Sequence, residues 1–258
     1  MRRLILEEPI SASAIWARRL AVFAIALAAI AVILVRTRAA DATAGLSVLG
    51  AAIFLACTAL LFAGAAAVTI WRLGQRGVGI AVAAVFLAVI VLAYPGFLAV
   101  QAVRLPVIKD ISTDINDPPA FARSARALRG RNGFIPPEVP PEQRLEQRRA
   151  YPTVQPINID LEPEEVYQLV LRAAAALGWQ VVDQIPPGGR AGIGRVDAVD
   201  RSIIMGLPDD ITVRIRPLAA QTRIDIRSAS RAGRHDFGAN ANRIQRFSQE
   251  MQTQLDAR

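Results

Sequence analysis

Three residue types are nearly absent from this sequence of 258 residues, and each absence excludes a kind of site. Cys57 is the only cysteine, so neither an intramolecular disulfide nor a cluster of thiol ligands can form. His235 is the only histidine, which excludes a metal site built from several histidines of one chain. Lys109 is the only lysine among 30 basic residues, so an arginine carries little information by its type alone. We predict no metal site and no cofactor.

Familiar catalytic motifs are absent as well. The sequence has no G-x-S-x-G, no phosphate-binding P-loop and no H-E-x-x-H. Ser228 and Ser230, with His235 and Asp236, offer the side chains of a hydrolytic triad. However, His235 and Asp236 are adjacent, and adjacent residues rarely orient each other. The sequence favours a protein without catalytic residues and leaves one alternative, a membrane-bound hydrolase that uses His235 with a nearby serine.

The distribution of charge argues against nucleic acid as a partner. Residues 1–103 contain 8 basic and 3 acidic residues, residues 104–149 contain 9 and 6, and residues 150–258 contain 13 of each. A nucleic-acid-binding protein concentrates positive charge on its folded domain. Here the excess falls in the N-terminal half, while the C-terminal part is neutral.

Uncharged apolar runs fill most of the first 103 residues. They are Leu20–Val35, Ala42–Trp71 and Gly77–Val103. A membrane-spanning helix needs about 20 residues, and the second and third runs exceed this length. The first run reaches it through residues 15–17 if Arg18 and Arg19 extend to the headgroups. A cleaved signal peptide is the alternative for this run, but Glu7 and Glu8 fit its basic start poorly. We predict three transmembrane helices in a membrane anchor of residues 1–103.

Basic residues beside these runs predict the orientation of the anchor. Six would lie on the side of the N-terminus: Arg2, Arg3, Arg18, Arg19, Arg72 and Arg76. Four would lie on the other side: Arg36, Arg38, Arg104 and Lys109. Because cytoplasmic loops carry the excess of basic residues, we expect a cytoplasmic N-terminus and a C-terminal domain outside the cytoplasm.

Residues 104–149 are rich in proline and arginine. Their seven prolines suppress helices and favour extended chain. We predict a juxtamembrane linker that holds a soluble domain of residues 150–258 away from the bilayer. Within it, Phe121, Ala125 and Leu128 can share one helical face between arginines, so this piece can also lie on anionic lipid headgroups.

Periodicity in residues 150–258 predicts an α+β domain. Apolar residues at helical spacing follow Pro163 and stop at Gly178, and a second such series ends at Leu255. Five strands are expected between these helices, at residues 179–184, 190–199, 202–207, 211–216 and 223–227. Short connections make the sheet antiparallel, with the two helices flanking it on one face. The last two strands alternate between apolar residues and arginines, which predicts one buried and one solvated face. We expect this domain to fold by itself.

Arginines and small polar residues gather between the last strand and the last helix. Guanidinium groups beside the N–H groups of a helix start can bind a phosphate or a carboxylate. The candidate ligand-binding residues are Arg227, Ser228, Ser230, Arg231, Arg234, Asn240 and Arg243. The alternative is a structural loop, in which Asp236 or Asn240 caps the helix and the arginines bond loop carbonyls or Asp225.

At this segment the sequence resembles a known family. The matching pieces are Asp209–Asp210, Asp225–Arg231, Gly233–Arg234, Asp236, Gly238, Asn240 and Arg243–Ile244, preceded by Ile111–Asp114 and Asp117–Phe121. They resemble membrane-anchored bacterial members of the family designated domain of unknown function 1499, over about residues 106–256. The resemblance implies a domain that faces the cell envelope and implies no activity. We therefore expect an inner-membrane protein whose periplasmic domain binds an envelope partner or an anionic ligand.

Overall fold

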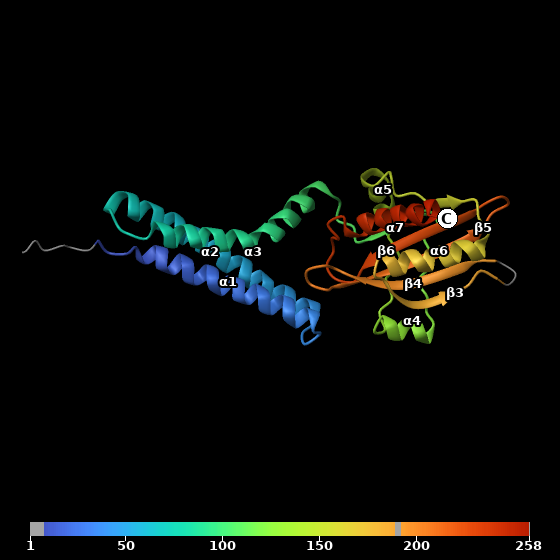
Figure 1. Ribbon diagram of the computed structural model, residues 1–258, viewed down its shortest axis with the longest axis horizontal. Helices are drawn as coiled ribbons and strands as arrows, with labels where there is room; N and C mark the ends of the chain where they lie inside the picture. Colours follow the sequence, from blue (N-terminus) through green and yellow to red (C-terminus); the bar gives the residue numbers. More distant parts are fainter. Residues whose placement is uncertain (1–7, 189–191, 258) are drawn as a thin grey trace, which may run out of the picture. The chain divides into compact units, whose positions relative to one another are not determined.

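The computed structural model describes residues 8–188 and 192–257 (Figure 1). It divides into two compact units. The helical unit is formed by the chain up to Val100, together with Ile204–Gly206. The α+β unit is formed by Gln101–Ile203 and Leu207–Arg258.

The helical unit contains the three predicted membrane helices. They are α1 (Ala12–Arg36), α2 (Ala42–Leu73) and α3 (Val78–Arg104), and each is long and apolar enough to cross a membrane. Their shared interior consists mainly of alanines, whereas large residues such as Phe54 and Leu61 point outward. Small residues let helix backbones approach closely, and large outward side chains suit lipid. The expectation of three apolar spans is confirmed.

Among the described residues, the α+β unit forms one antiparallel sheet of six strands. They are β1 (Asp110–Ser112), β2 (Ile157–Ile159), β3 (Gln180–Ile185), β4 (Gly194–Arg201), β5 (Pro208–Pro217) and β6 (Thr222–Ser230). The spatial order is β1-β6-β5-β4-β3, and β2 also pairs with β6. The predicted α+β class with an antiparallel sheet and flanking helices is confirmed.

Four predicted strands correspond to β3, β4, β5 and β6, although Arg190 and Ala191 lie outside the described residues. The strand predicted at residues 202–207 is wrong, because this segment is the turn between β4 and β5. Ser202 closes the turn: its N–H donates to the Leu207 carbonyl, and its hydroxyl accepts from the Leu207 N–H. Gly206 has a φ of 67°, a left-handed conformation that breaks the strand.

Two helices cover one face of the sheet, which we call the helix face. They are α6 (Pro163–Ala176) and α7 (Ala239–Asp256). The core between them and the strands is apolar and includes Ile211, Ile226 and Phe247. Trp179 stacks on Phe247 with ring centroids 5.3 Å apart. This part of the fold follows the predicted periodicity of the helices and strands.

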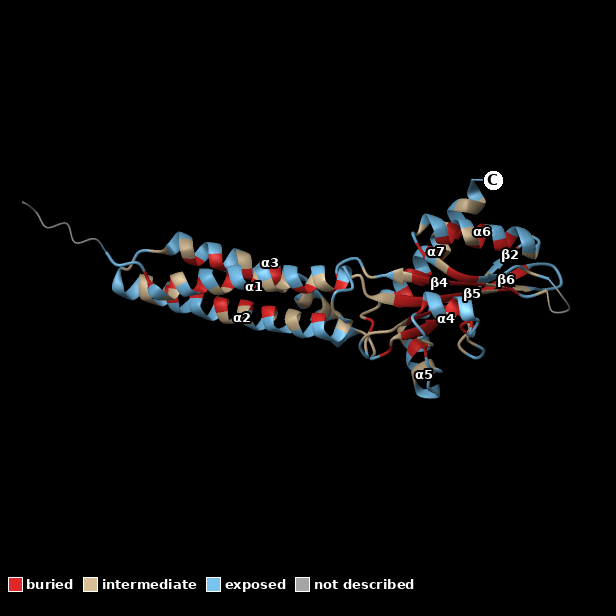
Figure 2. Ribbon diagram, turned by 90° about the horizontal axis from the view of Figure 1, so that it is seen from below, coloured by how far each residue is buried: buried red, intermediate tan, exposed pale blue. Residues whose placement is uncertain are grey.

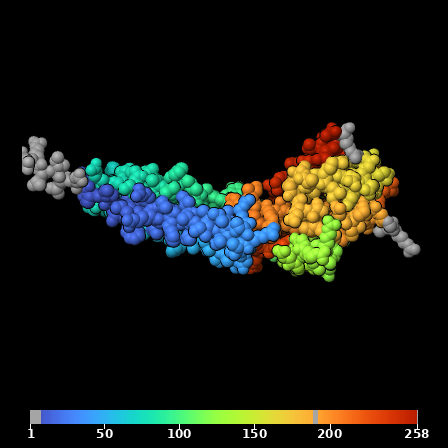
Figure 3. Space-filling view, turned by 60° about the horizontal axis from the view of Figure 1, so that its bottom comes forward, coloured from blue at the N-terminus to red at the C-terminus, as the bar shows by residue number. Residues whose placement is uncertain are grey.

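The opposite face, which we call the polar face, is covered by residues 113–150. This covering segment contains α4 (Ala125–Gly130) and α5 (Pro141–Ala150). Figure 2 shows α4 and α5 on one side of the sheet and α6 and α7 on the other. In Figure 3, the yellow-green chain around α4 stands beside the orange-yellow chain of β3 and β4. The expected solvated face is therefore buried beneath a second layer.

The predicted linker at residues 104–149 is consequently corrected. Most of it belongs to the α+β unit, because β1 pairs with β6 from Asp110 opposite Ala229 to Ser112 opposite Arg227. The side-chain amide of Gln147 in α5 bonds both the N–H and the carbonyl of Ser112. Its prolines favour extended chain, as predicted, but that chain lies on the sheet. Only five residues, 105–109, separate the end of α3 from β1.

These contacts reverse our expectation that residues 150–258 fold alone. We predict that a fragment of residues 105–258 unfolds cooperatively and that a fragment of residues 150–258 does not. The shorter fragment lacks β1 and Arg131, which pairs with the buried Asp197 and Asp210. Removing one partner of a buried ion pair costs about 3–5 kcal/mol, a large part of a domain's stability. Thermal unfolding followed by circular dichroism tests this. Equal melting temperatures for the two fragments would contradict it.

Candidate functional site

The polar face is held by a buried ion pair at its centre. Arg131 follows α4 and is fully buried, as are Asp197 of β4 and Asp210 of β5. Its guanidinium donates to Asp197 at 2.6 Å and to Asp210 at 3.1 Å. Burial is the main influence on the carboxyl of Asp197 and raises its pKa, against the opposing effects of the Ala122 N–H and Arg131. Arg131 therefore compensates both carboxylates, together with Arg195 of β4 beside Asp197 and Arg231 beside Asp210.

An aromatic ring lies between two of the arginines on this face. Phe121 is buried, and the guanidinium carbons of Arg131 and Arg227 lie 5.0 and 4.8 Å from its ring centroid. Arg227 of β6 binds Asp110 of β1 through two bonds of 2.9 and 2.7 Å. It also donates to the Pro137 carbonyl of the covering segment. Phe121 and Arg227 thus join the covering segment to the sheet.

A second cluster surrounds the buried Asp225 of β6. Its carboxylate accepts bonds from Arg214, Arg216 and Arg223, the three arginines that alternate with apolar residues in β5 and β6. The same arginines reach Asp114 of the covering segment. Burial disfavours the charged form of Asp114, but the N–H of Asp117 and the guanidinium of Arg223 outweigh it and lower the pKa. The predicted solvated arginines are therefore fixed in an ion-pair network.

A third cluster lies on the helix face, at the start of α7. Arg243 is nearly buried and binds Asp200 and Asp209, both at 2.6 Å. It also donates to the hydroxyl of Ser228 and to the side-chain oxygen of Asn240. Burial opposes the charge of Arg243, but the carboxylates of Asp209 and Asp200 outweigh it and raise the pKa. These groups satisfy one another within the chain.

The structure thus brings most of the predicted ligand-binding residues together, but mainly with partners inside the chain. Ser228 and Ser230 bond Asn240, and Arg231 forms two bonds to Asp210, at 2.9 and 2.8 Å. Arg234 differs, because it is exposed and has no ion pair or hydrogen bond within the described residues. The structural alternative predicted loop carbonyls or Asp225 as partners for these arginines. In the structure, Arg231 pairs with Asp210 instead.

The start of α7 also matches the structural alternative. Asp236 accepts the N–H groups of Gly238 and Asn240, at 3.0 Å each. Burial raises the pKa of Asp236, while these two bonds oppose the shift. The free N–H groups expected to bind an anion are therefore partly used by the chain's own carboxylate.

The side chains of the hydrolase alternative are not arranged as a triad. The two ring nitrogens of His235 face protein groups: Nδ1 accepts the Phe237 N–H, and Nε2 lies 3.2 Å from the Leu105 carbonyl. Asp236 lies 3.9 Å from Nδ1. Ser228 bonds Asn240 and Arg243 instead. No group of three potential metal ligands of the His, Cys, Asp or Glu type occurs within the described residues.

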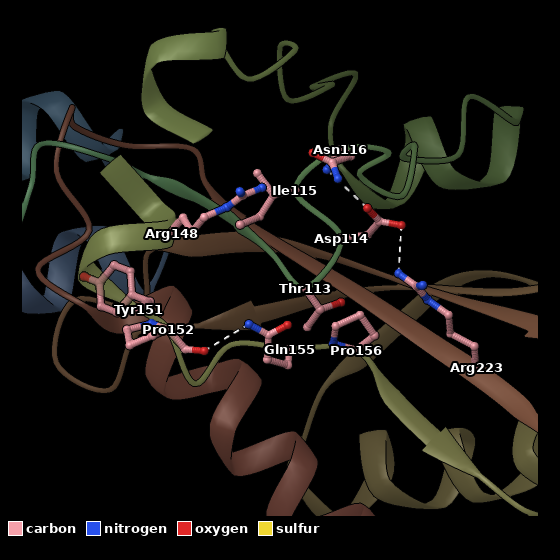
Figure 4. Close-up of a pocket in the computed structure, with 10 residues that line it drawn as sticks. All are labelled: Thr113, Asp114, Ile115, Asn116, Arg148, Tyr151, Pro152, Gln155, Pro156 and Arg223. Atoms are coloured by element: carbon pink, nitrogen blue, oxygen red, sulfur yellow. Dashed lines mark hydrogen bonds and ion pairs between the residues drawn. The ribbon is translucent and has the colours of Figure 1, made fainter. Parts of the chain in front are cut away.

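A cavity of about 380 Å³ opens beside the covering segment, near β6. Figure 4 shows its lining: Thr113, Asp114, Ile115, Asn116, Arg148, Tyr151, Pro152, Gln155, Pro156 and Arg223. These residues come from the chain after β1, from α5, from the connection to β2 and from β6. The cavity thus lies where the chain that follows β1 meets the end of α5 and the chain that leads to β2.

Two arginines line this cavity and differ in their partners. Arg223 is held by Asp114 and Asp225, at 2.9 and 2.8 Å. Arg148 is exposed and has no ion pair or hydrogen bond in the part of the chain that the structure describes. The phenol of Tyr151 stays neutral, because burial, with a smaller contribution from Asp236, raises its pKa to about 12. The cavity therefore offers one uncompensated positive charge beside neutral polar groups.

Sequence reasoning missed this cavity, although one signal pointed toward it. Residues 111–114 entered the sequence analysis only through the family resemblance, while Arg148 was assigned to the linker and Tyr151 to the start of the soluble domain. The apolar pair Val107 and Ile108 before Ile111 is the local pattern of a short strand. Recognising that strand would have placed Thr113 and Asp114 at a sheet edge.

We predict that Arg231 and Arg234 respond differently to mutation. Arg231→Ala should lower the free energy of unfolding by about 1–3 kcal/mol, because the fully buried Asp210 loses two charge-assisted bonds. Arg234→Ala, on the exposed side of the same loop, should change it by less than about 0.5 kcal/mol. Unfolding and sulfate binding are measured on both variants. A stable Arg231→Ala protein with weakened sulfate binding would favour the ligand-binding hypothesis for this segment.

Comparison with known proteins gives a family and no relative of known activity. No curated protein matches the chain. The model of a family described as a protein of unknown function, DUF1499, matches residues 110–251. The match begins at β1 and includes the covering segment, the sheet and most of α7, so the family's domain contains both faces of the sheet. The chain belongs to the DUF1499 family.

Proposed function

We propose that this protein is a membrane-anchored binding protein whose α+β unit holds a small anionic ligand in the cavity beside Arg148. The observation that carries the proposal is the uncompensated charge of Arg148. The strand arginines of the polar face, Arg195, Arg214, Arg216, Arg223 and Arg227, each meet a carboxylate, whereas Arg148 of α5 lines a cavity with no counterion among the described residues. A phosphate or carboxylate is the group that complements a guanidinium.

The rest of the lining suits a small polar ligand. Asn116 and Gln155 supply amide groups, and Thr113 supplies a hydroxyl. Arg223 adds positive charge on the side of the cavity opposite Arg148 (Figure 4). Asp114 is committed to Arg223 and to two backbone N–H groups, so it offers little to repel an anion. Specific binding therefore depends on Arg148 more than on any other cavity residue.

Replacing Arg148 tests this proposal. We expect Arg148→Gln to weaken sulfate or phosphate binding roughly 10- to 100-fold, because a charge-assisted hydrogen bond contributes about 1.5–3 kcal/mol. Arg149→Gln is the matched control, since Arg149 is the next residue of α5, is exposed and does not line the cavity. Isothermal titration of the full chain in nanodiscs gives both affinities. Equal affinities for the two variants, or no binding by the parent chain, would refute the proposal.

We also propose the orientation that the basic residues favour: a cytoplasmic N-terminus in a bacterial inner membrane, with the α+β unit in the periplasm. Its ligand or partner would then be a component of the cell envelope. The support is the count of six basic residues against four beside the spans.

Cysteine labelling tests the orientation. In a Cys57→Ser background, Gln221→Cys should react with an impermeant maleimide in intact spheroplasts, because Gln221 is exposed in the turn between β5 and β6. Gln75→Cys, between α2 and α3, should react only after lysis. The reverse pattern would place the α+β unit in the cytoplasm.

A further inference from the structure

One end of the sheet gathers three connections. Arg201 at the end of β4 pairs with Pro208 at the start of β5. Asp209 pairs with Ser230 near the end of β6, and Ala229 pairs with Asp110 at the start of β1. The turn at residues 202–207, the arginine loop at residues 231–238 and the chain arriving from α3 therefore share this end.

The chain arriving from α3 sets how far this end can be from the bilayer. Five residues, 105–109, lie between Arg104 and Asp110, and fully extended they reach about 20 Å. Neighbouring strands are spaced by about 4.8 Å, so the turn between β4 and β5 begins within about 15 Å of β1. The start of β1 is therefore confined to a short distance from the end of a membrane helix, whatever the angle of the unit.

The turn between β4 and β5 has the composition of a lipid-contacting tip. It carries Ile203, Ile204 and Met205 in succession: Ile203 is 84% exposed and Ile204 is 37% exposed, whereas Met205 is buried. Exposed Arg201 and Arg234 lie at the same sheet end. Apolar side chains flanked by arginines are the combination that enters the headgroup region of a bilayer with anionic lipid.

We propose that this turn dips into the interface of the bilayer that holds the three helices, with Ile203 and Ile204 as its inserted side chains. The partner is lipid, and the contact is separate from the cavity beside Arg148. Because the turn joins β4 to β5, it provides a second attachment of the sheet to the membrane, in addition to the covalent connection at residues 105–109. Two attachments at one sheet end restrict the unit's rotation about its connection.

Site-specific fluorescence of the full chain tests this inference. In the Cys57→Ser background, Ile203→Cys or Ile204→Cys is labelled with an environment-sensitive fluorophore, and the chain is placed in nanodiscs of phosphatidylcholine and phosphatidylglycerol. We expect blue-shifted emission and loss of fluorescence when spin-labelled lipid is included. Leu218→Cys is the matched control, because Leu218 is an exposed apolar residue in the turn at the opposite end of β5. Its label should emit as in water and be unaffected by spin-labelled lipid.

The possible results separate lipid contact from its alternatives. Water-like emission at both Ile203 and Ile204 would overturn the proposal, because neither side chain would be inserted. Blue-shifted emission without quenching by spin-labelled lipid would also overturn it, since the label would then be covered by protein. Quenching of the Leu218 label to the same degree would refute a contact specific to this end. None of these outcomes depends on whether sulfate binds beside Arg148.

Discussion

Carboxylates on a sheet face can be buried only if each of them meets a cation, and this requirement organises the α+β unit. Asp197, Asp210 and Asp225 are fully buried on the polar face. The sheet supplies part of the compensation through its own arginines, but the central guanidinium of Arg131 comes from the covering segment. Since a buried charge without a partner costs several kcal/mol, the sheet and this segment must fold together. The family match, over residues 110–251, includes both the sheet and this segment.

The helix face could be predicted because one rule, the periodic spacing of apolar residues, identifies its buried residues. Ile211 and Ile226 are apolar at alternate positions, and Phe247 recurs at helical spacing, so burial follows from periodicity. The same rule fails for the polar face, where it predicts exposure for residues that are buried. Thr212 and Asp225 look like solvated residues and are fully buried, because their cover is recruited from a distant part of the chain. Periodicity shows which residues share a face of the sheet. It does not show whether another segment of the chain covers a charged face.

The arginine segment shows why residue type alone predicts a binding site poorly. Arg227 and Arg231 were predicted to bind a ligand because arginines are frequent in this segment and precede the start of a helix. In the structure their partners are Asp110 and Asp210, which lie 117 and 21 residues away in the sequence, beyond the reach of local patterns. One signal was available: residues 150–258 contain 13 basic and 13 acidic residues, a balance that favours internal pairing over an anion-binding surface. Asp236, predicted as a possible cap, accepts the N–H of Asn240 in the first turn of α7, but the residue at the N-cap position is Gly238.

Where the buried arginines are already paired with carboxylates, an arginine that lines a cavity without a counterion is more informative than a cluster of paired charges. A paired guanidinium must give up its carboxylate before it can bind a ligand, and the carboxylate left behind would be buried and uncompensated. Arg243 would have to give up two such carboxylates, those of Asp200 and Asp209, before it could bind a ligand. Arg148 does not face this requirement, because binding an anion there orphans nothing among the described residues. The same reasoning makes Arg148 dispensable for folding, so losing it should separate binding from stability in a way that losing Arg243 cannot.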